Sequence, residues 1–157
     1  MSAARADANA GRRAARLAAV QALYQMEMSG ASTADVLADF DAGRLPRQQE
    51  APVDEGADAP LFRALLESAV SRQTTLDRAI ARRLAAGWRL DRLDSVARAI
   101  LRAGAAELEQ HRETPVAVVI DEYVEIAHAF FEGPEPGFIN GTLDACARDL
   151  RPAEEPA

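Results

Sequence analysis

Apolar residues recur at steps of three and four along most of the chain, and no segment alternates between apolar and polar residues. A first apolar stripe within residues 12–28 predicts a helix there. Ser32 and Asp35 form a candidate capping box for a second, shorter helix. Residues 43–60 mix proline, glycine, glutamine and acidic residues without a period, which predicts a long, mobile surface loop.

Two further helices are indicated in the middle of the chain. The first covers residues 60–86, where Pro60 suits the first turn and Gly87 ends the helix. Asp94 is a candidate N-cap for the next helix.

The last third of the chain predicts two more helices. Thr114 and Pro115 indicate an N-cap and a first-turn proline of a helix that continues to Phe130. The Gly/Pro-rich segment 133–137 ends that helix, and a final helix runs to residue 150.

This pattern predicts an all-α fold, a compact bundle of six to seven helices. A length of 157 residues suits one hydrophobic core, so we expect a single domain over residues 11–151. Residues 1–10 are expected to be a flexible N-terminal arm and residues 152–157 a disordered tail.

Composition argues against several classes of function. The longest strictly aliphatic run covers only residues 116–120, and the first thirty residues lack an apolar leader, so we expect a cytoplasmic protein without a membrane contact. One cysteine, Cys146, and two histidines, His111 and His128, provide no zinc-binding spacing. The sequence therefore predicts no metal, no cofactor and no enzymatic activity.

Charge is segregated along the chain, although the net charge is −7. Residues 1–26 carry four arginines and one acid, and residues 63–102 carry nine arginines and four acids, whereas the other two segments are strongly acidic. Such segregation can build a local basic patch on an acidic protein. All 18 basic residues are arginine, which we interpret mainly as a genomic bias. The alternative is a preference for bidentate phosphate contacts.

Three blocks of residues, in order, carry a resemblance to a known family. The first is RRAAR at residues 12–16 followed by AVQALY at residues 19–24. The second is LDSV at residues 93–96 with AILR at residues 99–102 and EL at residues 107–108. The third begins with TP at residues 114–115, passes DE at residues 121–122 and ends with FINGTLD at residues 138–144. Together they resemble the NusB family of transcription antitermination factors.

The resemblance implies a fold of two helical subdomains and a function in transcription. Proteins of this family pair with the ribosomal protein also called NusE. The pair binds the single-stranded boxA sequence of nascent RNA and joins the RNA polymerase elongation complex with other Nus factors. It thereby promotes read-through, notably in ribosomal RNA operons.

Arg12, Arg13 and Arg16 are candidate RNA-binding residues. They lie within about one turn of the expected helix start, where exposed amide groups add positive potential for phosphate. The family uses this arginine-rich opening for boxA. Without the resemblance, a solvated and frayed N-terminus explains the same pattern.

A second candidate RNA contact lies late in the chain. Phe130 and Phe138 flank the Gly/Pro-rich turn, and unpaired RNA bases are commonly stacked on such rings. Periodicity alone favours core packing for both rings. Asn140 is a candidate for hydrogen bonds to backbone or RNA, and Gly141 beside it suggests close helix packing.

Tyr24 and Glu107 match family positions associated with the protein partner. A tyrosine offers a broad contact, and a glutamate can accept a charge-assisted bond from a basic ribosomal protein. The alternatives are a core residue for Tyr24 and a solvated helix charge for Glu107.

Two other classes of function compete with the RNA adaptor. A helical protein-interaction or dimerisation module would need only the acidic C-terminal third and the apolar stripes. An RNA methyltransferase is disfavoured, because the sequence shows no glycine-rich cofactor loop.

Overall fold

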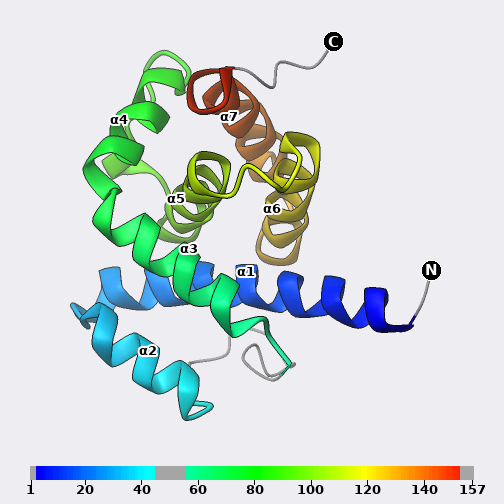
Figure 1. Cartoon of the computed structure of the whole chain (residues 1–157). Helices are drawn as coiled ribbons and strands as arrows, with labels where there is room; N and C mark the ends of the chain where they lie inside the picture. The colour runs from blue at the N-terminus through cyan, green and yellow to red at the C-terminus, as the bar shows by residue number, and fades with distance from the viewer. Residues whose placement is uncertain (1–2, 45–55, 153–157) are drawn as a thin grey trace. The chain divides into compact units, whose positions relative to one another are not determined.

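The computed structural model describes residues 3–44 and 56–152, and in these ranges the chain forms seven α-helices, one 3-10 turn and no strand (Figure 1). The predicted all-α fold of six to seven helices is confirmed. Residues 45–55 of the predicted mobile loop and residues 153–157 of the predicted tail lie outside the described ranges. The elements are α1 (Ala3–Ser29), α2 (Thr33–Asp41), α3 (Ala59–Ser71), α4 (Gln73–Arg83), η1 (Leu90–Arg92), α5 (Ser95–Gln110), α6 (Val116–Phe130) and α7 (Glu135–Leu150).

The chain divides into two compact units, Met1–Glu67 and Ser68–Ala157. The boundary between them falls within α3. The expectation of a single domain over residues 11–151 did not include this division.

Helix α1 begins at Ala3, nine residues earlier than the apolar stripe predicted. The preceding segment is rich in alanine, the strongest helix former, and contains no proline, so the helix extends beyond its apolar stripe. Residues 3–10, which we assigned to an N-terminal arm, are therefore helical. Arg12 consequently lies about two and a half turns inside the helix and not at its start.

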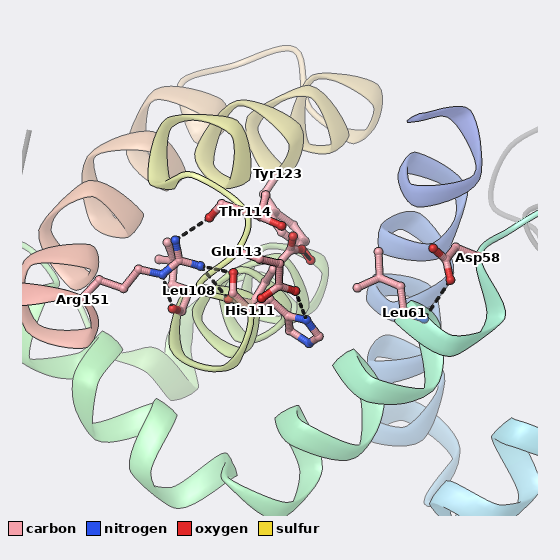
Figure 2. A network of polar contacts seen from close by, with 9 residues as sticks. Asp58, Leu61, Leu108, His111, Glu113, Thr114, Tyr123 and Arg151 are labelled. Carbon is pink, nitrogen blue, oxygen red and sulfur yellow. Dashed lines mark hydrogen bonds and ion pairs between the residues drawn. The ribbon is translucent and has the colours of Figure 1, made fainter. Parts of the chain in front are cut away.

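Helices α2 and α3 begin at side-chain caps. The Asp35 backbone N–H donates to Ser32 Oγ at 3.1 Å and the Ser32 N–H donates to Asp35 Oδ2 at 3.4 Å, so the predicted capping box is confirmed. At the start of α3, the Leu61 N–H donates to Asp58 Oδ1 at 3.0 Å (Figure 2). The Asp58 N–H donates in turn to the Gly11 carbonyl of α1 at 2.9 Å. These bonds fix where both helices start.

One aromatic stack joins α2 to α3 in the first unit. The rings of Phe40 and Phe62 lie 4.0 Å apart between centroids and are nearly parallel, at 11°. Both side chains are buried, so the stack forms part of the core of this unit.

The single helix predicted over residues 60–86 is wrong, because the chain breaks at Arg72 into α3 and α4. Arg72 adopts φ −103° and ψ 11°, and its carbonyl accepts the Leu76 N–H at 2.9 Å to start the new helix. Thr74 and Thr75 follow the break, and β-branched residues lower helix propensity. The apolar stripe continues through the break, which is why periodicity did not reveal it.

Helix α5 is the most enclosed helix described in the second unit, where it packs against α4, α6 and α7 (Figure 1). Eleven of its sixteen residues are buried, and residues 103–108 are buried consecutively, so every face of the helix is covered there. Asp94 caps it as predicted and accepts the Val96 N–H at 2.8 Å and the Ala97 N–H at 3.3 Å. Several of the buried residues of α5 are alanines, and one is Gly104, so the neighbouring helices can approach it closely.

Gly104 of α5 lies where α6 and α7 approach this helix closely. A Cβ atom built on Gly104 would lie 3.0 and 3.1 Å from the methyl groups of Leu143 and 3.5 Å from the Tyr123 ring. The same atom on Gly141 of α7 would meet nothing within 4 Å. Our expectation that Gly141 permits close helix packing is therefore wrong, since Gly104 has that role.

Arginine–carboxylate pairs connect α4 to α5 and α7. Each uses two guanidinium nitrogens and both carboxylate oxygens, a geometry that fixes orientation. The Arg72 guanidinium lowers the pKa of the Glu109 carboxyl, and Arg83 lowers that of Asp149 in the same way. The three pairs are Arg72–Glu109, Arg83–Asp149 and Arg102–Asp77.

The starts of α6 and α7 differ from the sequence prediction. Pro115, not Thr114, occupies the N-cap of α6, with φ −58° and ψ 146° and no side-chain cap bond. Helix α7 begins at Glu135, so part of the Gly/Pro-rich segment forms its first turn with Pro136 near the start. Proline fits this position because the first helical N–H groups have no partner inside the helix.

Arg151, directly after α7, holds the end of α5. Its side chain is buried, and its guanidinium donates to the carbonyls of Leu108, Glu107 and His111 and to that of Thr114 before α6 (Figure 2). The Glu107 and His111 carbonyls also accept backbone N–H groups, those of His111 and Thr114 respectively. The guanidinium is therefore a second donor for these two carbonyls, and it satisfies the Leu108 and Thr114 carbonyls near the helix end. The C-terminal ends of α5 and α7 are thereby joined.

Replacement of Arg151 by methionine should lower the free energy of unfolding by about 2 kcal/mol or more, because the Leu108 and Thr114 carbonyls lose the guanidinium donor and each carbonyl left without one costs about 1–3 kcal/mol. The control Arg148→Met removes an exposed arginine that pairs only with Asp144 on its own helix. That change should cost less than about 0.5 kcal/mol. Urea unfolding followed by circular dichroism measures both, and equal losses would contradict the role of Arg151.

The two glycines should respond in opposite directions to alanine. Gly104→Ala forces a methyl group against Leu143 and should lower the free energy of unfolding by about 1–2 kcal/mol. Gly141→Ala should raise it by about 0.5–1 kcal/mol, because alanine is the better helix former and the site is open. Thermal unfolding of both variants measures the difference, and a stabilised Gly104→Ala protein would refute the close contact.

Candidate functional site

The three arginines predicted to bind RNA have different environments on α1. Arg13 is exposed, Arg12 is half-buried with its guanidinium donating to Asn9 Oδ1, and Arg16 is only 2 % exposed. The predicted exposed helix start is therefore wrong for this group. The helix dipole cannot help to bind phosphate here, since the first-turn amides lie near Ala3.

The burial of Arg16 follows from helical geometry. Val20 and Leu23 come four and seven residues after it, so the three side chains share one face of α1. Both apolar residues are buried, and this face includes Arg16. The helix predicted over residues 12–28 already placed Arg16 on this face, but its charge suggested exposure.

The aromatic candidates lie in the second unit, where α6 and α7 pack together. Phe130 is the last residue of α6 and Phe138 lies in the first turns of α7; both are half-buried. Asn140 is exposed on α7. Core packing alone does not account for these rings, because part of each remains at the surface. Their contact with RNA stays a prediction.

A residue missed by sequence reasoning lies against Phe138. The indole ring of Trp88, in the linker between α4 and η1, has its centroid 5.6 Å from that of Phe138, at an interplanar angle of 46°. Trp88 is 56 % exposed. The available signal was a single tryptophan between Gly87 and Arg89 in a linker.

The two partner candidates differ in accessibility. Tyr24 is half-buried on α1 and stays a candidate. Glu107 is 0 % exposed and accepts a hydrogen bond from the Tyr123 hydroxyl at 2.8 Å. Neither interpretation of Glu107 holds, because it is neither a surface contact nor a solvated charge. It lies in the fully covered part of α5.

The thiol of Cys146, the single cysteine of the chain, is buried. It is directed toward the Ala79 carbonyl at 3.7 Å. Desolvation raises the pKa of this thiol to about 11, so it is neutral at physiological pH.

Within the described ranges no group of three or more His, Cys, Asp or Glu residues is arranged to hold a metal ion. Among the described helices, none has the length and apolar character needed to cross a membrane.

Fold and surface define a small helical protein with arginines on α1 and half-exposed aromatic rings around the start of α7. The family model described as the NusB family matches residues 13–148, and the chain belongs to this family. A relative from Caulobacter vibrioides, transcription antitermination protein NusB, is 56% identical over 140 residues, covering 89% of this chain and 94% of the relative. The protein of the same name from Maricaulis maris is 51% identical over 91% and 89% of the two chains.

Solved structures share the fold. NusB from T. maritima superimposes with a TM-score of 0.73 at 31% identity, covering 91% of this chain and 94% of that chain. A NusB chain crystallised with NusE and double-stranded RNA gives a TM-score of 0.71 over 88% and 96% of the two chains. Its identity to this chain is 22%, so it demonstrates similarity of fold.

Arg16 and Arg13 should differ sharply when replaced by alanine. Arg16→Ala removes a buried cation and should lower the free energy of unfolding by about 2–4 kcal/mol. Arg13→Ala changes an exposed position and should shift it by less than about 0.5 kcal/mol. Chemical denaturation of the two variants provides the measurement. If Arg16→Ala is as stable as the unmodified chain, this arginine has no structural role.

Proposed function

We propose that the chain is an RNA-binding transcription antitermination adaptor that pairs with ribosomal protein NusE and binds boxA-type single-stranded RNA. It would join the RNA polymerase elongation complex with other Nus factors in the cytoplasm and promote read-through in ribosomal RNA operons. The observation that carries this proposal is the 56% identity to a transcription antitermination protein over most of both chains. The chain would act by binding and would catalyse no reaction.

Arg12 and Arg13 are the proposed phosphate contacts, since they retain side chains at the surface of α1. Phe130, Phe138 and Asn140 are the proposed base contacts in the second unit. Arg16 is not proposed as a contact because it is buried. Phosphate contacts position an RNA without reading its sequence, whereas stacked and hydrogen-bonded bases can be read.

Tyr24 is the proposed contact for the protein partner. A half-buried tyrosine combines a broad apolar surface with one hydroxyl, a composition common at protein interfaces. The net charge of −7 disfavours strong RNA binding by the isolated chain. A basic partner would supply further positive potential and a second set of RNA contacts.

A helical protein-interaction module without RNA binding is the second candidate function. The acidic final segment supports it, because residues 103–157 carry three arginines and twelve acids. The two functions predict different salt dependence. Binding to RNA phosphates releases counterions and weakens steeply with salt, whereas an apolar protein contact does not.

Binding of a labelled boxA-type RNA should be weak for the isolated chain and at least about tenfold tighter with NusE present, because two linked sets of contacts act together. Replacing Arg12 and Arg13 together by alanine should then flatten the plot of log affinity against log salt by about 1.4 units, at 0.7 per lost contact. Fluorescence anisotropy at several salt concentrations measures both effects.

The matched control is the double variant Arg44→Ala with Arg148→Ala, which removes the same charge from exposed positions elsewhere. It should lower affinity slightly and leave the slope nearly unchanged. Absence of RNA binding with and without NusE would leave the protein-interaction module as the function. An identical slope for both double variants would remove Arg12 and Arg13 from the interface.

A further inference from the structure

Trp88 is the largest aromatic side chain at the described surface, and its position has no explanation in the packing of the second unit. More than half of its surface, 56 %, is exposed. Its remaining surface includes the contact with Phe138, a ring from a helix fifty residues further along the chain. A large apolar ring left in water forgoes the stabilisation of burial, about 1.5–3 kcal/mol for a large apolar side chain, so its exposure suggests an external contact.

The linker that carries Trp88 is held in place on both sides. The Trp88 N–H donates to the Ala85 carbonyl at 3.0 Å, and Gly87 allows the turn with φ +89°. Arg98 of α5, itself largely buried, donates to the carbonyls of Leu90 at 3.1 Å and Leu93 at 2.7 Å. A ring on such a linker is pre-organised, which reduces the entropy lost on binding.

The helix surface beside the ring pair is open. Gly141 follows Phe138 by three residues and therefore lies next to it on the same side of α7. Gly137 is adjacent in sequence, and a Cβ atom on either glycine would meet nothing within 4 Å. Both glycines are exposed. A flat group can thus approach Phe138 without meeting another side chain at these two positions.

Two exposed arginines lie in the linker beside the ring pair. Arg89 precedes η1 and Arg92 is its last residue; both are exposed, within the chain segment that carries nine arginines and four acids. Asp91 and Asp94 are the acids of the linker; Arg89 lies 3.3 Å from Asp91, and Asp94 accepts the amides of α5. Glu135 lies at the start of α7. The arginines adjoin an aromatic pair, which is the combination that binds single-stranded RNA.

We propose that Trp88 and Phe138 form one stacking platform for an unpaired base of the bound RNA, with Arg92 contacting an adjoining phosphate. This inference rests on the proposed RNA-binding function and adds a base contact from the α4–α5 linker. The platform is continuous with the proposed base contact at Phe138. A tilted pair of rings presents two differently oriented surfaces, so one base stacks on the indole while the phenyl ring supports it from the side.

The chain contains a single tryptophan, so its fluorescence reports on this site alone. The full-length chain is titrated with fluorescein-labelled boxA-type RNA for affinity and with the unlabelled RNA for tryptophan emission. Stacking of a base on the indole should quench the emission in parallel with binding. Trp88→Ala should weaken RNA affinity roughly 5- to 100-fold, which corresponds to the loss of one base stack.

Two further variants separate stacking from structural support of Phe138. Trp88→Phe retains an aromatic plane and should keep most of the affinity, whereas Trp88→Leu retains apolar bulk against Phe138 and should lose as much as alanine. The control Val118→Ala changes another exposed apolar residue, on α6, and should leave affinity unchanged. Full affinity of Trp88→Leu would show that the ring serves packing alone.

The outcomes distinguish this inference from the proposed function. If labelled RNA binds but the emission does not change and Trp88→Ala retains its affinity, the platform is refuted and the RNA adaptor stands. If the Trp88 variants lose affinity for NusE alone, the ring belongs to a protein interface and the platform is again refuted. If neither the unmodified chain nor any of the variants binds RNA, with or without NusE, the proposed function fails.

Discussion

The C-terminal end of α5, held by Arg151, is the constraint on which the second unit depends. The carbonyls of Glu107 and Leu108 belong to the fully covered part of this helix, where an unsatisfied carbonyl is costly. Arg151 provides the donors from outside the helix, since it follows α7 and reaches carbonyls at the end of α5 and before α6 (Figure 2). The length of α7 and the turn between α5 and α6 must therefore match each other. Gly104 serves the same helix by allowing Leu143 of α7 to approach it closely.

Enclosure of α5 also decides which residues can bind a ligand. A helix that is covered on every face contributes no binding side chains from its middle, which explains why Glu107 bonds to Tyr123 and is not at the surface. The proposed aromatic contacts of this unit come from helix ends and connections. Phe130 ends α6, Phe138 lies near the start of α7 and Trp88 lies in a linker. Such positions combine exposure with rigid support, because the neighbouring helix ends are fixed by capping and by buried arginines.

Local features were predictable from the sequence, and features that depend on distant packing were not. The caps formed by Ser32 and Asp94 involve residues two or three positions apart, so the sequence contains all the necessary information. The burial of Arg16 and Glu107 depends on the helices that cover them, and charge alone suggested exposure. The pairing of Trp88 with Phe138 joins residues fifty positions apart, which no periodicity reveals. The break at Arg72 was hidden because the apolar stripe continues across it.

Arginine count also overstates the positive potential that RNA would meet. Several arginines of the basic segment 63–102 form pairs with acids of the same chain, and Arg98 is buried in contact with backbone carbonyls. The paired residues are Arg63, Arg72, Arg83, Arg89 and Arg102. A paired charge attracts a phosphate less than an isolated one, because its partner cancels much of its field at a distance. The other exposed arginines of this segment are Arg78, Arg82 and Arg92, on a chain of net charge −7. In the proposed function, RNA binding would then depend on stacked bases and on a basic partner, which would give the aromatic residues more influence on affinity than their number suggests.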